Sequence, residues 1–165
     1  MNSIELIREN LQRSETIVLS RIEEMRDHCL TPPSPQAGCH TLWILGHLAY
    51  IEHLVIDRFM LGRENPLQHW ERVFDGAEVS TDHSLFTPFD QTLAECRAAR
   101  SSTLALLDSY QESDLDQISV DAPRETEKLF GTHRRCFQYC ADHWFMHRGQ
   151  LADARCAAGQ ARMWY

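Results

Sequence analysis

The sequence predicts an all-α protein folded as a four-helix bundle, and three observations support this fold class. Apolar residues recur at steps of three and four over four long stretches, which is the period of an amphipathic helix. Residues that cap or break helices bound each stretch. The only alternating stretch, residues 118–120, is too short to count as a strand. The chain has 165 residues, so we expect one domain over residues 1–165.

The first predicted helix begins at Ser3, which is placed as its N-cap, with Glu5 in the first turn. The proline-rich run at 31–35 ends this helix and makes a loop. Its inward positions follow the helical period and are Ile4, Ile7, Leu11, Val18, Ile22 and Met25.

The second predicted helix begins near Thr41 and is closed by Gly62. Its inward stripe consists of Ile44, His47, Leu48, Ile51, Val55 and Phe59. Residues 63–86 show no sustained period and predict a crossing connection with one short helical turn at 67–73. Such a connection is long enough to run back along the bundle, so the second and third helices could be parallel, although its length alone leaves this open.

The third predicted helix starts with Thr87 as N-cap and Pro88 at the first helical position. Its inward positions are Phe89, Leu93, Cys96, Thr103 or Leu104, Leu107 and Tyr110. Residues 111–131 predict a second irregular connection, and the last helix runs over 132–157. The stripe of the last helix is Cys136, Cys140, His143, His147, Leu151 and Ala154.

Charge and composition exclude several classes of partner. The 16 basic and 24 acidic residues give a net charge of -8, which repels nucleic acid and anionic membrane surfaces. No apolar run has the length of a membrane span, and the first ten residues lack a signal-peptide pattern. We therefore expect a cytoplasmic protein whose six cysteines are reduced thiols.

Three histidines are candidates for metal ligands. His143 and His147 are four residues apart, so they share one helix face and can converge on one ion. His47 lies in the inward stripe of the second helix and could supply a third imidazole across the bundle. Three protein ligands leave a position for water or substrate, as in catalytic zinc sites. The alternative is that these are hydrogen-bonded core histidines without a metal.

Cys136 and Cys140 suggest a rival site together with the two histidines of the last helix. These four residues span about 16 Å of one helix, which is too far for one tetrahedral zinc ion. We expect both cysteines to be small core residues, and a thiol role for Cys140 beside His143 stays open.

Several neighbours could assist the histidines. Gln150 shares their helix face and could orient a ligand histidine or a bound water. Glu52 and Asp142 are turned away by roughly 140° and 100° from the adjacent histidines, so we expect solvated carboxylates. Arg148 is expected in a surface or interhelix ion pair, with binding of an acidic substrate as the alternative. Three aromatic residues are expected in the core, or alternatively in a pocket wall: Trp43, Trp144 and Phe145.

Two motifs resemble those of the DinB/YfiT-like superfamily of metalloenzymes. The first is Leu-Trp-Ile-Leu-Gly-His-Leu-Ala at 42–49, and the second is His-Trp-Phe-Met-His-Arg-Gly-Gln-Leu at 143–151. The Arg-Gly-Gln extension is more specific than the histidine pair, and the resemblance covers nearly the whole chain. It implies an up-down-down-up bundle in which His47, His143 and His147 hold one divalent metal ion.

The resemblance also implies a cofactor and a set of partners. The metal would be zinc, nickel, iron or manganese, and the protein would be a homodimer acting on a small-molecule substrate. Some relatives use a low-molecular-weight thiol such as bacillithiol or mycothiol, and others resemble enzymes that join sulfur to histidine derivatives. The hypothesis that follows is a metal-dependent thiol S-transferase acting on a small electrophile. A metal-dependent hydrolase and a non-catalytic, stress-related binding protein for a metal or small molecule are the alternatives.

Overall fold

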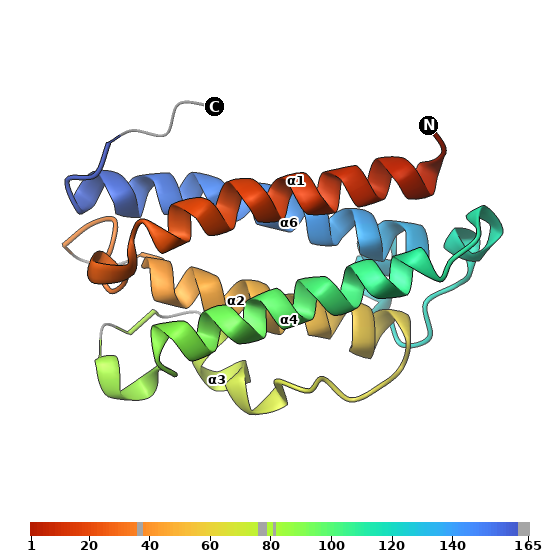
Figure 1. Cartoon of the computed structure of the whole chain (residues 1–165). Coiled ribbons are helices and arrows are strands. Elements are labelled where there is room, and N and C mark those ends of the chain that lie inside the picture. Colours follow the sequence, from red (N-terminus) through yellow and green to blue (C-terminus); the bar gives the residue numbers. More distant parts are fainter. Residues whose placement is uncertain (36–37, 76–78, 81, 162–165) are drawn as a thin grey trace.

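Four long helices form the bundle in the computed structural model, which describes residues 1–35, 38–75, 79–80 and 82–161 (Figure 1). They are α1 (Ser3–Glu23), α2 (Thr41–His53), α4 (Phe89–Asp108) and α6 (His133–Ala157). α1 and α6 pack side by side and run in the same direction, whereas α2 and α4 pack side by side and both run in the reverse direction (Figure 1). The order along the chain is therefore up-down-down-up, and the prediction of a four-helix bundle with a long crossover is confirmed.

Short helical segments fill the connections. They are η1 (Arg26–His28), η3 (Gln68–Trp70), α3 (Glu71–Phe74), η4 (His83–Leu85), η5 (Glu112–Asp116), η6 (Arg124–Thr126) and α5 (Glu127–Phe130). The helical turn predicted at 67–73 is thus present as η3 and α3. Over the described ranges there is no sheet, and the weak strand signal at 118–120 forms one isolated bridge between Ile118 and Thr132.

The start of α1 differs from the prediction by one residue. Asn2, not Ser3, is the N-cap, because its side-chain oxygen accepts a hydrogen bond of 2.8 Å from the backbone N–H of Glu5. The Glu5 carboxylate in turn accepts the backbone N–H of Asn2 at 3.0 Å. This reciprocal capping box requires an acid three residues after the cap. Glu5 stands three residues after Asn2, whereas no acid stands three residues after Ser3.

The start of α4 also differs from the prediction. Pro88 is the capping residue and Phe89 is the first helical residue, so Thr87 is not the N-cap. Pro88 has an extended backbone, with φ -53° and ψ 145°, and its carbonyl accepts the first helical hydrogen bond from the N–H of Thr92 at 2.9 Å. The last helix, predicted over 132–157, is found over His133–Ala157, with Thr132 as its N-cap, whose side chain accepts from the backbone N–H of Arg135.

The second helix is not one regular helix to Gly62, as predicted. It changes after His53 into the π-helical segment η2 (Leu54–Met60), where the N–H of Leu61 donates to the carbonyl of Ile56 at 3.2 Å. Gly62 does end the segment, with φ +66°. A Cβ at Gly62 would lie 2.6 Å from Val120 Cγ1, so both the backbone angle and the packing require glycine.

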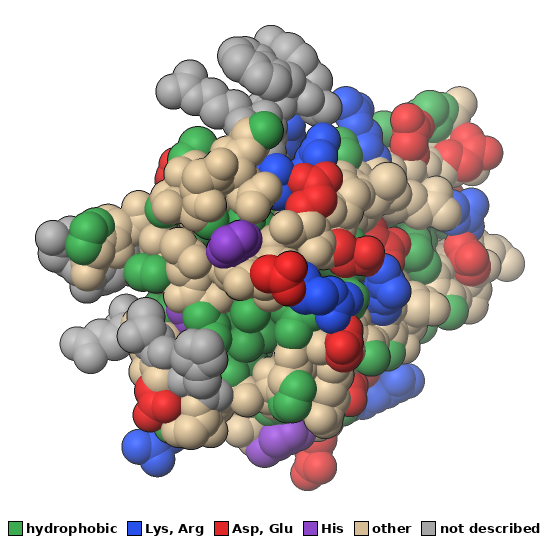
Figure 2. Space-filling view, turned by 60° about the vertical axis from the view of Figure 1, so that its left-hand side comes forward, with side chains coloured by type: hydrophobic (Ala, Val, Ile, Leu, Met, Phe, Trp, Pro, Cys, Tyr) green, Lys and Arg blue, Asp and Glu red, His purple; other side chains and the backbone are tan. Residues whose placement is uncertain are grey.

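The core consists of two apolar clusters, one toward each end of the bundle. Cys96, Cys136 and Cys140 are buried within them as small residues, and all six cysteines are free thiols. Figure 2 turns the left-hand end of Figure 1 forward and shows apolar side chains in the middle of that face, with most charged side chains to their right. Among the described residues, no helix combines the length and apolar character needed to cross a bilayer.

Candidate metal centre

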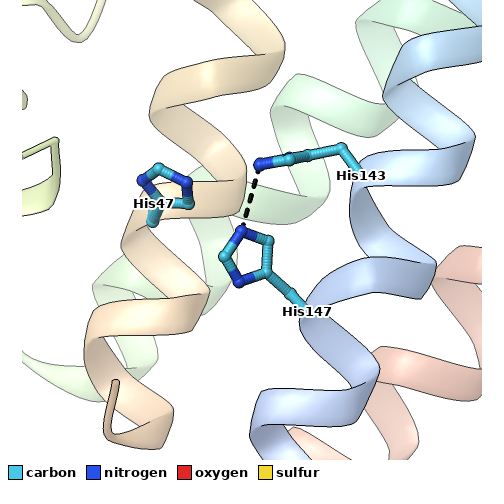
Figure 3. A group of neighbouring side chains, drawn as sticks. All are labelled: His47, His143 and His147. Atoms are coloured by element: carbon cyan, nitrogen blue, oxygen red, sulfur yellow. Dashed lines mark hydrogen bonds between the residues drawn. The ribbon is translucent and has the colours of Figure 1, made fainter. Parts of the chain in front are cut away.

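Three imidazoles meet between α2 and α6 (Figure 3). His47 projects from α2, and His143 and His147 project from successive turns of α6. One ring nitrogen of each residue lies within 4.8 Å of the others. Three points no more than 4.8 Å apart lie within about 2.8 Å of a common centre, close to the metal–nitrogen distance of about 2.1 Å. The predicted ligand set is therefore brought together.

A glycine beside His47 sets the position of that ligand. A Cβ at Gly46 would lie 2.1 Å from the ring of Phe74, so only glycine allows Phe74 to pack directly on α2. The carbonyl of Phe74 then accepts a hydrogen bond of 2.6 Å from His47 Nδ1. Trp43 stacks on the His47 ring at 4.5 Å and donates its indole N–H to the carbonyl of Val73. Residues of α3 thus orient the only ligand that α2 supplies.

Hydrogen bonds also determine which ring nitrogens are available to a metal. A carbonyl can only accept, so His47 carries its proton on Nδ1 and keeps a lone pair on Nε2. His147 Nδ1 donates to Gln150 Oε1 at 2.7 Å, which leaves a lone pair on its Nε2 as well. His143 Nε2 lies 3.0 Å from His147 Nε2 and donates to it. A divalent ion replacing that shared proton would meet three Nε2 lone pairs, so this donor set fits a metal.

The surroundings keep the three imidazoles neutral. Burial, together with the nearby His147 ring and against the opposing hydrogen bond to Phe74, lowers the pKa of His47 to about 4. Burial lowers the pKa of His143 to about 2, with the other two imidazoles and Arg100 acting in the same direction. The pKa of His147 is also lowered by burial, against the opposing effect of its hydrogen bond to Gln150. All three are therefore in the unprotonated form that can bind a metal at neutral pH.

The other residues singled out from the sequence have varied positions. Gln150 lies against His147, as its helix position suggested, and Tyr139 stacks on His143 at 5.3 Å. Asp142 is exposed, as expected.

Arg148 forms no ion pair with any residue that the structure describes, and its Nε is buried without a hydrogen-bond partner. The aromatic residues Trp43 and Trp144 are buried, and Phe145 is half-buried.

The prediction of a solvated Glu52 is wrong. Glu52 is 3% exposed and forms a buried ion pair with Arg100, whose Nη2 lies 2.8 Å from Glu52 Oε2. Trp144 donates its indole N–H to the same oxygen at 2.9 Å, and the Arg100 guanidinium lies 4.2 Å from the Trp144 ring centroid. Arg100 also donates to the backbone carbonyls of Leu11 and Cys140. This Glu52–Arg100–Trp144 network joins all four long helices.

A sequence signal for this network exists. Arg100 continues the apolar stripe of α4, whose buried positions are Leu93, Cys96, Arg100, Thr103 and Leu107. Glu52 continues a row on α2 that includes Leu45, Leu48 and Ile56. Opposite charges that replace apolar residues on two facing stripes indicate a buried pair, since either charge alone would be costly to bury.

A family model described as the DinB superfamily matches residues 10–151. The chain belongs to the DinB superfamily. The matched region includes all three histidines and Gln150, so the candidate metal centre lies inside the part of the chain that defines its DinB membership. No curated protein matches the chain at a significant level.

The fold of this DinB-superfamily chain is also similar to a solved structure, a conserved protein from Enterococcus faecalis. The TM-score is 0.66 at 18% sequence identity, with 97% of this chain and 99% of that chain covered. At this identity the likeness shows a shared fold over the whole domain and carries no argument about activity.

Proposed function

We propose that the protein binds one divalent metal ion through Nε2 of His47, His143 and His147, and uses it to transfer a small thiol to an electrophilic substrate. The observation that carries the metal-binding part is the convergence of three neutral ring nitrogens within 4.8 Å. Phe74 and Gln150 support it, because each accepts from an Nδ1 and thereby directs an Nε2 toward the centre.

Three protein ligands leave room for a further one, which favours a reactive site over a structural one. When bound, zinc, nickel, iron or manganese would hold a thiol as its nucleophilic thiolate at neutral pH. The three histidines hold the ion, and Trp43 and Tyr139 keep two of their rings in place by stacking. The S–H proton is released to solvent, a sulfur–carbon bond forms, and the leaving group departs with its bonding electrons.

The reacting thiol would belong to a cosubstrate, because the chain's own cysteines nearby are poor nucleophiles. Burial raises the pKa of the Cys140 thiol well above its ordinary value, and Cys96 is affected in the same way. Both remain protonated at neutral pH inside the core. A low-molecular-weight thiol is therefore the better source of sulfur. The proposal places the protein in the cytoplasm as a homodimer.

Mixing the metal-loaded protein with chlorodinitrobenzene and a panel of small thiols tests this proposal. The panel contains cysteine, glutathione, bacillithiol and mycothiol. We expect conjugate to form faster than with the free thiol, to depend on added metal, and to be lost in His147→Ala. His28→Ala is the matched control, because His28 is exposed and outside the cluster.

Two outcomes would replace the proposal. Metal-dependent cleavage of an ester or amide, without conjugation, would indicate a hydrolase that uses metal-bound water. Metal binding without turnover in either assay would indicate a binding protein. Equal conjugation rates for wild type and His147→Ala would show that the three-histidine cluster is not the reacting site.

A further inference from the structure

A groove of about 430 Å³ lies away from the metal centre, between η2 and the second half of α4. Its polar lining consists of His53, Asp57 and Arg63 on one side, and Ser102, Thr103 and Ser109 on the other. The volume is within the range of about 300–1,000 Å³ typical of small-molecule sites. None of its lining residues belongs to the three-histidine cluster.

One side of the groove carries a fixed histidine. His53 Nδ1 donates to Asp57 Oδ2 at 2.7 Å, and the two side chains are 14% and 21% exposed. With its proton on Nδ1, His53 keeps a lone pair on Nε2 that can accept a hydrogen bond from a ligand. Asp57 lies in the π-helical segment η2, and π turns are rare and occur often at functional sites.

Arg63 is an exposed cation at one end of the groove. Its backbone N–H donates to the carbonyl of Asp57 at 2.8 Å, which holds the residue beside the groove. Within the described parts of the chain, the Arg63 side chain forms no ion pair. The Asp57 carboxylate accepts from His53 and forms no ion pair with Arg63, so the Arg63 guanidinium can pair with an anion at its own end of the groove.

Apolar side chains complete the lining. Ile56 and Leu61 face Ala99 and Leu106 across the groove. A ligand that fits this lining has an apolar body, a negative group at one end for Arg63, and a hydrogen-bond donor for His53. The carboxylate of Asp57 would repel an anion placed beside His53, so the negative group belongs at the Arg63 end.

We propose that this groove is a second ligand site that binds a small organic acid. The ligand carboxylate pairs with the Arg63 guanidinium, its alkyl body packs on Ile56 and Leu106, and a hydroxyl or amine group donates to His53 Nε2. Binding requires no metal, because the site uses none of the three metal-centre histidines.

Chemical-shift titration of metal-free, ¹⁵N-labelled protein with hexanoate tests the proposal, with hexanol and hexylammonium as matched neutral and cationic probes. We expect hexanoate to shift amide signals of residues 53–63 and 99–109 with a dissociation constant on the order of 1 mM. Hexanol and hexylammonium should bind at least about tenfold more weakly, because neither pairs with a guanidinium.

Two variants separate specific binding from general charge effects. Arg63→Gln should weaken hexanoate binding by about tenfold or more, whereas Arg13→Gln, an equal charge change at an exposed position on α1, should leave it unchanged. Ser102→Trp should block the groove without altering its charges. The proposal is overturned if hexanoate shifts no groove signal, if it shifts only signals around the three histidines, or if both arginine variants behave alike.

Discussion

Two buried polar clusters both use side chains of α2 and α6, the first together with Arg100 of α4, and their chemistry is opposite. In the Glu52–Arg100–Trp144 network an anion and a cation neutralise each other, with neutral donors and acceptors around them. In the three-histidine cluster, neutral rings direct nitrogens at one another and share a single hydrogen bond, between His143 and His147. The first cluster pairs its two charges within the chain, and only Glu52 Oε1 is left without a hydrogen-bond partner among its buried carboxylate oxygens. The second gathers three neutral ring nitrogens without a charge among them and could hold a divalent cation.

Breaking the ion pair should have the largest effect. Arg100→Met leaves Glu52 buried without its counterion and should lower the free energy of unfolding by about 3–5 kcal/mol. Arg97→Met is the matched control on the same helix, since Arg97 pairs with Glu23 at the surface and should contribute less than about 1 kcal/mol. Urea denaturation measures both. Equal effects of the two variants would show that the buried pair has no special structural role.

Adding a divalent cation that binds the three histidines should stabilise the protein by a smaller amount. Zinc or nickel at 100 times its dissociation constant should raise the free energy of unfolding by about 2.7 kcal/mol. Magnesium should not, because it prefers oxygen ligands over imidazole. Thermal unfolding of metal-free protein with each ion checks this. Equal stabilisation by magnesium would indicate binding to surface carboxylates instead.

Acidification should destabilise the metal-free protein through the histidine cluster. The folded pKa of His47 is about 4, against 6.5 for an ordinary histidine, so below pH 6.5 the unfolded state binds more protons. Stability should therefore be constant above pH 6.5 and fall as the pH drops toward 4. His47 alone should account for about 2 kcal/mol between pH 7 and pH 5.

Two variants assign this pH dependence. His47→Asn should make the curve of unfolding free energy against pH less steep, with the remaining slope due to His143 and His147, whereas the same change at the exposed His69 should leave the curve unaltered. A wild-type curve that is level between pH 7 and pH 5 would contradict the neutral, buried state of these imidazoles.

Removing the hydrogen-bond partner of one metal-ligand histidine should have the smallest effect of these changes. Gln150→Ala frees His147 Nδ1 and should weaken metal binding by about tenfold, or about 1.4 kcal/mol. Gln138→Ala, at an exposed position on the same helix, should leave the affinity unchanged. Calorimetric metal titration of both variants checks this, and an unaltered affinity in Gln150→Ala would remove Gln150 from the site.

The difference between the clusters also explains how far the sequence alone could lead. His143 and His147 are one turn apart on a single helix, so local periodicity places them together and on the buried face. The position of His47 could also be predicted, because it required only that the apolar stripe of the second helix face the core. The network was missed because it depends on Glu52 and Arg100, which are 48 residues apart and gain meaning only when α2 and α4 pack side by side.

The other differences between the predicted and the observed structure also depend on individual contacts that the pattern of residue types does not reveal. The π-helical turn after His53 depends on tertiary packing, because a regular helix satisfies the same apolar pattern. The partner of His47 is a backbone carbonyl of Phe74 in a connection without periodicity, and carbonyl positions leave no trace in residue types. The two N-caps differ from the prediction by one residue each, because capping depends on individual hydrogen bonds at Asn2 and Pro88.

The most direct test of the central claim is a calorimetric titration of metal-free protein with zinc or nickel at neutral pH. We predict one ion per chain for the wild type, loss of that binding in His47→Ala, His143→Ala and His147→Ala, and an unchanged isotherm for His28→Ala. Retention of wild-type affinity in any of the three cluster variants, or no saturable binding by the wild type, would contradict a metal centre built from these histidines.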